Sequence, residues 1–413
     1  TYLITYIILA ATFGYAMIMA ETAIGRMSQK SPVGAFAHFS KKKSYRLGGW
    51  INAIVPMLIV PYYSVIGGWV IKYLFDYITK PAKKIATDGY FSDFISGATP
   101  EIWFIIFALL TTVIVYMGVQ SGIERVSKIL MPILVVLAAV ICVYTMTRPG
   151  AGAGIKYLLV PSTKRFSWMT IVTAMQQMFY SLSIAMGILI TFGSYMKKEV
   201  SIEESTDQVE IFDTLIAFLA GLMIIPAVFA FSGSDAGKNL DAGPSLMFIT
   251  MPKTFASFPS GRVFGLLFFL LVLFAALTSS IALMESAVST LEDELKWSRK
   301  KSTLVIGAVM LGLGTLSALG YGVLADVKII GMQFLDFFDF ITNSVMMPLA
   351  AIATCLLVTK VIGLDVVDEE VTLGGAKFVR KKIFHFMIKW LCPLFCLIIL
   401  VSAVANAFGV IHL

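Results

Sequence analysis

The chain has 413 residues, of which 58% are hydrophobic and only 14% are charged, and it carries a formal net charge of +7. Soluble globular domains have about 25% charged residues, so this composition excludes a soluble domain and predicts a polytopic membrane protein. The basic residues lie in short loops between apolar runs rather than on one face, which argues against nucleic-acid binding.

Cysteine and histidine usage argues against a metalloenzyme. All four cysteines lie inside apolar runs, where a thiol behaves as a small hydrophobic group, and the three histidines are far apart in the sequence. No nucleophile is paired with a base in the sequence. We therefore expect no disulfide framework and no metal centre, and an integral-membrane enzyme is the least favoured class.

Apolar runs long enough to cross a bilayer, about 20 residues each, predict ten membrane-spanning helices. Their predicted ranges are 1–22, 50–79, 103–122, 128–147, 168–195, 211–231, 263–291, 303–322, 332–358 and 386–410. Basic residues are concentrated in the loops at 26–46, 292–302 and 359–385, which the positive-inside rule places in the cytoplasm. The basic 148–167 loop is external in this topology and breaks the rule mildly.

The predicted span at 168–195 is interrupted halfway by the sequence Ser-Leu-Ser-Ile-Ala-Met-Gly at 181–187. Two hydroxyls, an alanine and a glycine at this depth suggest a broken helix. Unwound backbone inside a membrane is tolerated only where it lines a cavity or is buried in protein. The segment therefore indicates a binding site for a small molecule, unless its small residues merely let two helices approach closely.

An ionisable group within a membrane span is costly and is a functional candidate, and four acidic residues in the predicted spans stand out: Glu21, Asp213, Asp336 and Asp339. Asp213 offers hard oxygen ligands to an alkali cation. Asp339 is placed either to gate access by pairing with a cation or to reach interfacial water. The hydroxyls at 278–280 are, from the residues alone, most simply explained as contacts between helices.

Several motifs together resemble the neurotransmitter:sodium symporter family, in its bacterial branch of amino-acid transporters. These motifs lie at 20–26, 61–63 with Trp69, 122–128, 177–187, 275–282 and 291–295. The resemblance is collinear over nearly the whole chain. It implies an all-α polytopic membrane protein with the LeuT fold and its inverted repeats.

In this alignment the ten spans correspond to helices 2 to 11 of the family pattern, so the family's first helix is expected to be missing through N-terminal truncation. The implied organisation is a remainder of the first inverted repeat at 1–147 and a second repeat at 148–358. A cytoplasmic loop and a final helix follow at 359–413.

The resemblance also implies site residues, position by position. The substrate site would comprise Ile59, Tyr63, Tyr180, Ser181, Ser183, Met186, Ser279 and Leu283. Two sodium ions are implied, the first bound by Ser181 and Asp213, the second by Ala275, Thr278 and Ser279. The outer gate would comprise Tyr63, Tyr180, Gln177 and Asp339.

The implied pocket is apolar at Ile59, Met186 and Leu283, which favours a neutral, hydrophobic amino acid. Chloride-dependent relatives are expected to hold a serine where this chain has Ala217, and Asp213 supplies a fixed negative charge nearby. We therefore predict chloride-independent transport. The chain has no Asn-x-Ser/Thr acceptor, and a bacterial inner membrane is the expected location.

The sequence thus predicts a sodium-coupled symporter that works by alternating access, without an organic cofactor. Its partners would be an amino acid and the lipid bilayer, with the oligomeric state open. Two alternatives remain at this stage. One is a proton-coupled carrier of the same fold, in which Glu21 and Asp213 carry protons. The other is a membrane protein or inactive fragment that binds an amino acid without moving it.

Overall fold

A computed structural model describes residues 2–161, 167–233 and 243–407, and their secondary structure is helical apart from one isolated bridge between Ile329 and Met332. Within these residues, nine helical stretches are long and apolar enough to cross a membrane. They are Tyr2–Ser28, Lys43–Thr79, Thr99–Tyr116, Val119–Met146, Ile202–Ser232, Gly261–Leu295, Arg299–Leu319, Phe334–Ile362 and Lys381–Ala407.

Four of these stretches combine several elements because π-helical turns interrupt them. The first contains α1 (Tyr2–Leu9), η1 (Ala10–Gly14) and α2 (Tyr15–Ser28), and the fourth contains η2 (Val119–Glu124) and α8 (Arg125–Met146). The eighth contains α16 (Phe334–Asp339), η6 (Phe340–Met346), α17 (Met347–Leu357) and η7 (Val358–Ile362). The last contains α19 (Lys381–Phe386), η9 (Met387–Leu391) and α20 (Cys392–Ala407). The 246–256 segment outside the spans also begins with a π turn, η5 (Leu246–Thr250), followed by α13 (Met251–Ala256).

The remaining long helices are continuous: α4 (Lys43–Thr79), α7 (Thr99–Tyr116), α12 (Ile202–Ser232), α14 (Gly261–Leu295) and α15 (Arg299–Leu319). Short helices occupy the connections: α3 (Pro32–Phe39), α5 (Ala82–Ile85), α6 (Tyr90–Ile95), α9 (Ala151–Leu159), α18 (Leu364–Val371) and η8 (Leu373–Gly375). The predicted span at 168–195 is covered instead by two shorter helices, α10 (Trp168–Ser181) and α11 (Ile188–Ser194).

Helix α4 organises one half of the molecule and packs against α14, α7, α15, α3 and α17. Glycines make the contact with α7 close, because a Cβ at Gly67 would lie 2.5 Å from the ring of Phe107 and one at Gly68 would lie 2.5 Å from the Phe104 nitrogen. Small residues at such positions let membrane helices approach backbone to backbone.

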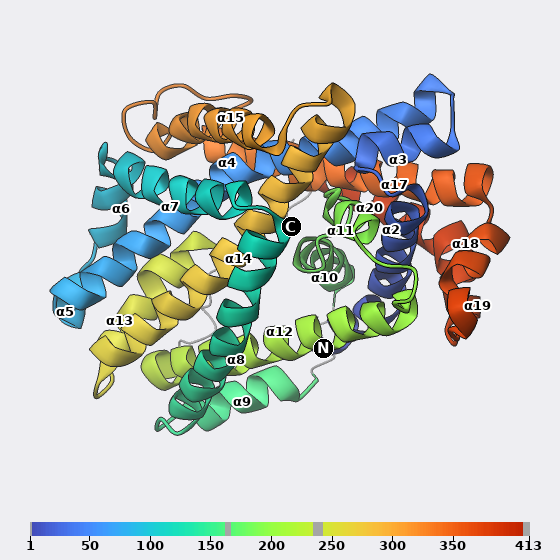
Figure 1. Cartoon of the computed structure of the whole chain (residues 1–413). Helices are drawn as coiled ribbons and strands as arrows, with labels where there is room; N and C mark the ends of the chain where they lie inside the picture. Colours follow the sequence, from blue (N-terminus) through green and yellow to red (C-terminus); the bar gives the residue numbers. More distant parts are fainter. Residues whose placement is uncertain (1, 162–166, 234–242, 408–413) are drawn as a thin grey trace.

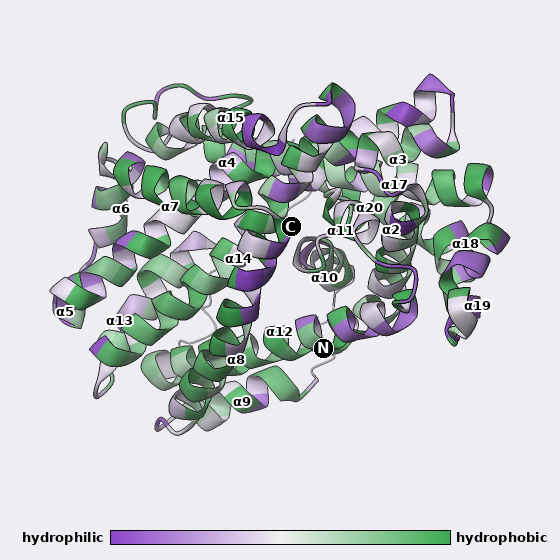
Figure 2. Cartoon of the chain, in the orientation of Figure 1, coloured by the Kyte–Doolittle hydropathy of each residue, from purple (hydrophilic) through white to green (hydrophobic). Residues whose placement is uncertain are grey.

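The other half gathers around the broken segment. Figure 1 shows α10 in the middle of the view, with α14, α11, α2 and α12 around it. Helix α2 packs on α11, α12 packs on α8 and α9, and α17 packs on α20. Hydrophobic residues predominate along α7, whereas the short helix α18 carries several hydrophilic residues (Figure 2). The elements that meet around α10 supply the candidate site.

Candidate functional site

The helix break predicted from the sequence is confirmed. Helix α10 ends at Ser181 and α11 begins at Ile188, and between them the φ angles of Ser183, Ala185 and Gly187 are 55°, 60° and 68°. Left-handed backbone is unfavourable for residues with a Cβ, so surrounding contacts must hold this conformation. The backbone N–H of Ala185 donates to Oε1 of the fully buried Glu21 at 3.0 Å, which ties the break to α2.

Gly187 closes the break at a crowded point. A Cβ there would lie 2.8 Å from the Asn52 carbonyl oxygen, 2.8 Å from Pro32 and 2.9 Å from the Ser286 hydroxyl. Ser286 Oγ also lies 3.5 Å from the carbonyl oxygen of Met186. The unwound segment is therefore clamped between α3, α4 and α14.

Asp213 and Ser181, proposed as ligands of the first ion, lie together at the start of the break. Ser181 donates to Asp213 Oδ1 at 2.6 Å, and Tyr6 of α1 donates to Oδ2 at 2.7 Å. Two hydroxyl donors on one carboxyl group fit its ionised form, which only accepts hydrogen bonds. The cluster is thus a fixed negative charge with additional hydroxyl oxygens, the ligand type that hard cations prefer.

The residues proposed for the second ion lie on α14. The Thr278 hydroxyl donates to the carbonyl oxygens of Phe274 and Ala275, each at 3.0 Å. Ser279 is exposed, and its hydroxyl lies within hydrogen-bond reach of the Tyr63 hydroxyl on α4. The Ala275 carbonyl and the Thr278 hydroxyl therefore sit side by side, which permits both oxygens to reach one cation.

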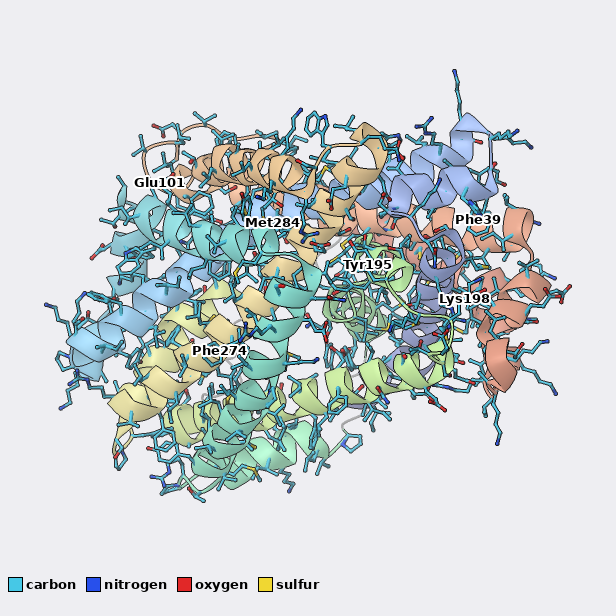
Figure 3. All side chains as sticks on the ribbon, in the orientation of Figure 1. Phe39, Glu101, Tyr195, Lys198, Phe274 and Met284 are labelled. Carbon is cyan, nitrogen blue, oxygen red and sulfur yellow. The ribbon has the colours of Figure 1, made fainter. Side chains whose placement is uncertain are left out.

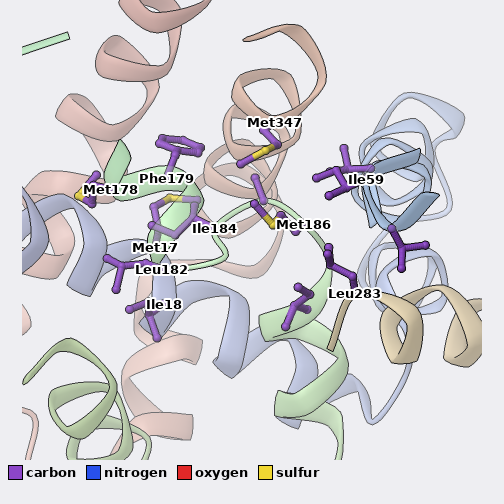
Figure 4. Close-up of a cluster of buried hydrophobic side chains, with 14 of the residues drawn as sticks. Met17, Ile18, Ile59, Met178, Phe179, Leu182, Ile184, Met186, Leu283 and Met347 are labelled. Atoms are coloured by element: carbon purple, nitrogen blue, oxygen red, sulfur yellow. The ribbon is translucent and has the colours of Figure 1, made fainter. Parts of the chain in front are cut away.

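The three apolar residues of the expected substrate pocket are deeply buried. Ile59 of α4 is 0% exposed, Met186 in the break is 3% exposed and Leu283 of α14 is 4% exposed. Figure 4 shows these three side chains on one side of the break, with Met347 of α17 above them. Ser183 is half-buried in the same unwound segment.

The outer residues fall into two groups. Tyr180 belongs to α10 and lies near Tyr62, Tyr63 and Asp339. Gln177 is exposed on α10, and within the described part of the chain no hydrogen bond joins it to Asp339. The structure therefore brings Asp339 next to tyrosines of α4 and leaves Gln177 apart.

A cavity of about 830 Å³ opens beside Gln177, between α1, α9, α10 and α12. Tyr6 and Ala217 also line it, so it borders the Asp213 side of the site. Ile59, Met186 and Leu283 are absent from its lining. The cavity thus does not coincide with the apolar substrate pocket expected from the sequence.

Below the break, a buried ion pair joins three elements. Glu285 of α14 is 0% exposed and pairs with Arg299 of α15. Tyr195, labelled in Figure 3 directly after α11, donates to Glu285 Oε1 at 2.7 Å. Arg299 also donates to the Val115 carbonyl oxygen at 2.9 Å. This cluster ties the end of the broken span to its scaffold.

Sequence reasoning missed Tyr6, Tyr62 and Asn343. Tyr6 lies inside an apolar run, and its partner Asp213 is 207 residues away. Tyr62 belonged to a motif we had singled out, and consecutive helix residues point about 100° apart, so only one of Tyr62 and Tyr63 can face any given neighbour. That spacing was the available signal that Tyr62 has a different role.

The chemistry available at this site is coordination by oxygen rather than bond making. The described residues contain no group of three or more His, Cys, Asp or Glu side chains placed to hold a metal ion. What they do contain is unwound backbone with hydroxyl and carboxyl groups against it, together with buried apolar side chains such as Met186. This combination is typical of transporter sites built on discontinuous helices.

Comparisons with known proteins agree with this geometry. The model of the sodium:neurotransmitter symporter family matches residues 91–410. The chain is 30% identical over 410 residues to the uncharacterized sodium-dependent transporter YhdH of Bacillus subtilis, covering 98% of this chain and 89% of that protein. It is 28% identical over 391 residues to an uncharacterized sodium-dependent transporter of Methanocaldococcus jannaschii, covering 90% of this chain and 76% of that protein.

A solved structure is also similar. The crystal structure of MhsT in complex with L-phenylalanine superposes with a TM-score of 0.87 at 34% sequence identity, covering 97% of this chain and 91% of that one. Fold and site define a multi-pass helical membrane transporter rather than an enzyme. The chain belongs to the sodium:neurotransmitter symporter family.

Proposed function

We propose that the protein is a sodium-coupled symporter of a neutral, hydrophobic amino acid that works by alternating access in a bacterial inner membrane. The observation that carries this proposal is the unwound segment at 181–187, which has Ser181, hydrogen-bonded to Asp213, at one end and the buried apolar side chain of Met186 near the other. A zwitterionic amino acid needs a cation near its carboxylate and an apolar surround for its side chain. The phenylalanine bound by the similar MhsT structure supports the same substrate class.

In this proposal two sodium ions bind, one at Ser181 and Asp213 and one at Ala275, Thr278 and Ser279. Moving one charge through 100 mV is worth about 2.3 kcal/mol. Two ions therefore supply about 4.6 kcal/mol before any concentration term, enough for a concentrative ratio in the thousands. No organic cofactor takes part.

Chloride independence follows from Asp213 in this account. Its carboxylate already balances one sodium charge, and both of its oxygens are held by hydroxyl donors. Replacing chloride with gluconate is expected to leave uptake unchanged, measured with labelled substrate in proteoliposomes. Collapse of uptake in gluconate contradicts the assignment.

Competition binding with a panel of neutral amino acids tests the substrate class. The apolar lining by Ile59, Met186 and Leu283 predicts that leucine, isoleucine, methionine or phenylalanine displaces a labelled ligand, whereas lysine and glutamate do not. Preferred binding of a charged amino acid overturns this class, because a buried charge without a partner is costly.

A proton-coupled carrier is the second candidate, favoured by one observation. Glu21 is fully buried and its Oε2 has no hydrogen-bond partner among the described residues. A neutral carboxylic acid tolerates such a position better than a carboxylate does. Uptake driven by a pH gradient in the absence of sodium supports this candidate over the first.

A further inference from the structure

The outer carboxylate Asp339 is anchored to the scaffold through one of its two oxygens. Tyr62 of α4 donates to Asp339 Oδ1 at 3.2 Å, and Asn343 of η6 donates to the same oxygen at 2.5 Å. Tyr62 is only 2% exposed, whereas Asp339 at the end of α16 is exposed. A buried hydroxyl thus reaches a carboxylate 277 residues away in the chain.

The anchor is a closed network rather than a single contact. The amide nitrogen of Asn343 also lies 3.4 Å from the Tyr62 hydroxyl, so its two hydrogens serve both partners. The Thr342 hydroxyl donates to the Phe338 carbonyl oxygen at 2.7 Å and lies 3.3 Å from the Tyr62 hydroxyl. Thr342 therefore uses its own proton elsewhere, which leaves the Tyr62 proton for the carboxylate.

The second oxygen of Asp339 is unused in this network. Throughout residues 2–161, 167–233 and 243–407, no donor reaches Asp339 Oδ2, and the carbonyl oxygen of the Asn343 side chain is buried without a partner. A carboxylate fixed on one side keeps its orientation without having to be ordered when a cation arrives. Such preorganisation makes the second oxygen a stronger acceptor.

We propose that Tyr62 is a positioning residue for Asp339: its buried hydroxyl holds Oδ1 on α4, so that Oδ2 stays available to a guanidinium or ammonium group when the outer path closes. This inference rests on the proposed transport function and on the gating role of Asp339. The two neighbouring tyrosines then have different roles: Tyr63 faces Ser279, and Tyr62 faces the gate carboxylate.

The test is the rate at which bound amino acid escapes from the sodium-saturated protein. Tritiated L-phenylalanine, or the tightest-binding member of the panel, is loaded onto the purified full-length protein and chased with unlabelled ligand. Tyr62→Phe is expected to raise the escape rate about tenfold, the size of one hydrogen bond to a charged acceptor. Asp339→Asn is expected to raise it at least as much.

The double variant Tyr62→Phe with Asp339→Asn distinguishes a positioning role of Tyr62 from a general loss of stability. Since Tyr62 acts through Asp339, Tyr62→Phe is expected to add little in the Asp339→Asn background. Additive effects overturn the proposal. If Tyr62→Phe does not fold, Asn343→Leu removes the other donor to the same oxygen and must show the same loss of effect in that background.

Two matched variants control for the loss of a tyrosine hydroxyl. Tyr77→Phe removes a buried hydroxyl on the same helix that has no hydrogen-bond partner among the described residues. Tyr321→Phe removes a hydroxyl that donates to Asp336 at 2.8 Å, three residues before Asp339. Neither is expected to change the escape rate. An equal change in Tyr77→Phe contradicts the positioning role.

The outcomes also distinguish failure of this inference from failure of the gate. An unchanged escape rate in Asp339→Asn removes the gating role, and the positioning proposal falls with it. A raised rate in Asp339→Asn together with an unchanged rate in Tyr62→Phe removes only the positioning proposal.

Discussion

At the scale of single residues, Asp213 carries the greatest weight. Its carboxylate accepts from Ser181 and Tyr6, and in our proposal it supplies the charge that binds a sodium ion. Asp213→Asn keeps the shape and removes the charge. It is expected to raise the sodium concentration for half-maximal uptake by about tenfold, equal to 1.4 kcal/mol.

The control for that measurement is Glu204→Gln, which removes a charge of the same sign at an exposed position in the first turn of the same helix, α12. It is expected to leave the sodium requirement unchanged. Thr278→Val tests the second ion in the same way, because it removes a hydroxyl oxygen and keeps a similar volume. An unchanged sodium requirement in both Asp213→Asn and Thr278→Val would contradict the proposed ion ligands.

Variants of Glu21 distinguish sodium coupling from proton coupling. In Glu21→Gln the amide oxygen still accepts from the Ala185 N–H, so sodium-driven uptake is expected to stay within about threefold of the original rate. Glu21→Leu removes the acceptor and leaves that N–H unpaired, which costs about 1–3 kcal/mol. Thermal unfolding midpoints and initial uptake rates measure both effects.

The opposite pattern supports proton coupling. If Glu21→Gln abolishes transport while binding and thermal stability are retained, the titratable proton of Glu21 is essential. The hydrogen bond to Ala185 would then be secondary to the proton that the residue carries.

At the scale of elements, the break between α10 and α11 depends on Gly187. Its φ of 68° is unfavourable for any residue with a Cβ, and a methyl group there meets backbone and side chains at 2.8 Å. Gly187→Ala is therefore expected to lower the unfolding midpoint and abolish uptake. Gly312→Ala on α15 is the matched control, because a Cβ there meets nothing within 4 Å.

A second element-scale prediction concerns the Glu285–Arg299 pair. Removing one partner of a buried ion pair leaves a charge uncompensated and costs about 3–5 kcal/mol, whereas apolar replacement of both partners is often close to neutral. Arg299→Met alone is expected to lower the unfolding midpoint sharply. Glu285→Met with Arg299→Met is expected to recover most of it, and equal losses in the single and double variants contradict this account.

Hydropathy located the helices but not their ends. Nine of the ten predicted ranges overlap long helices, yet α4 begins at Lys43 rather than at residue 50, and α12 begins at Ile202 rather than at 211. The added turns are polar, and Glu203 in the first of them is buried because Tyr15 and the backbone of Val379 donate to it. A hydropathy average cannot assign such polar residues to a helix, since the partners that allow their burial lie far away in the sequence.

The residue types of the candidate site could be predicted from the sequence, but the hydrogen bonds between them could not. The small residues and glycine at 181–187 predicted the helix break from the sequence alone, because residues of this kind in the middle of a membrane span favour unwound backbone. The bond from Tyr62 to Asp339 and the one from Tyr6 to Asp213 arise only when helices pack. The 830 Å³ cavity beside Gln177 was likewise not visible in the sequence.

At the scale of the whole molecule, the proposed ion sites, the break and the outer carboxylate lie on different elements, of which α12 and α14 flank α10 (Figure 1). In our proposal, alternating access requires the elements that carry the Ser181–Asp213 pair and Asp339 to move relative to the scaffold of α4, α7, α14 and α15. In our account the binding of sodium and amino acid favours one arrangement, and a ligand shifts such an equilibrium only through its differential affinity for the two states. Sodium and substrate are therefore expected to raise each other's affinity by the same factor.

That reciprocity is measurable by equilibrium binding. The affinity for labelled amino acid, titrated at increasing sodium, and the affinity for sodium, titrated at increasing amino acid, are expected to change by equal factors. Potassium at the same ionic strength is the control for general salt effects. Independent binding of the two ligands argues against a shared site.

The central claim is that a sodium gradient drives a hydrophobic amino acid across the membrane. The most direct measurement is uptake of the tightest-binding labelled amino acid into proteoliposomes, with an inward sodium gradient, an inward proton gradient or neither. The account predicts accumulation with the sodium gradient alone. Accumulation with the proton gradient in the absence of sodium, or binding without accumulation under any gradient, would contradict it.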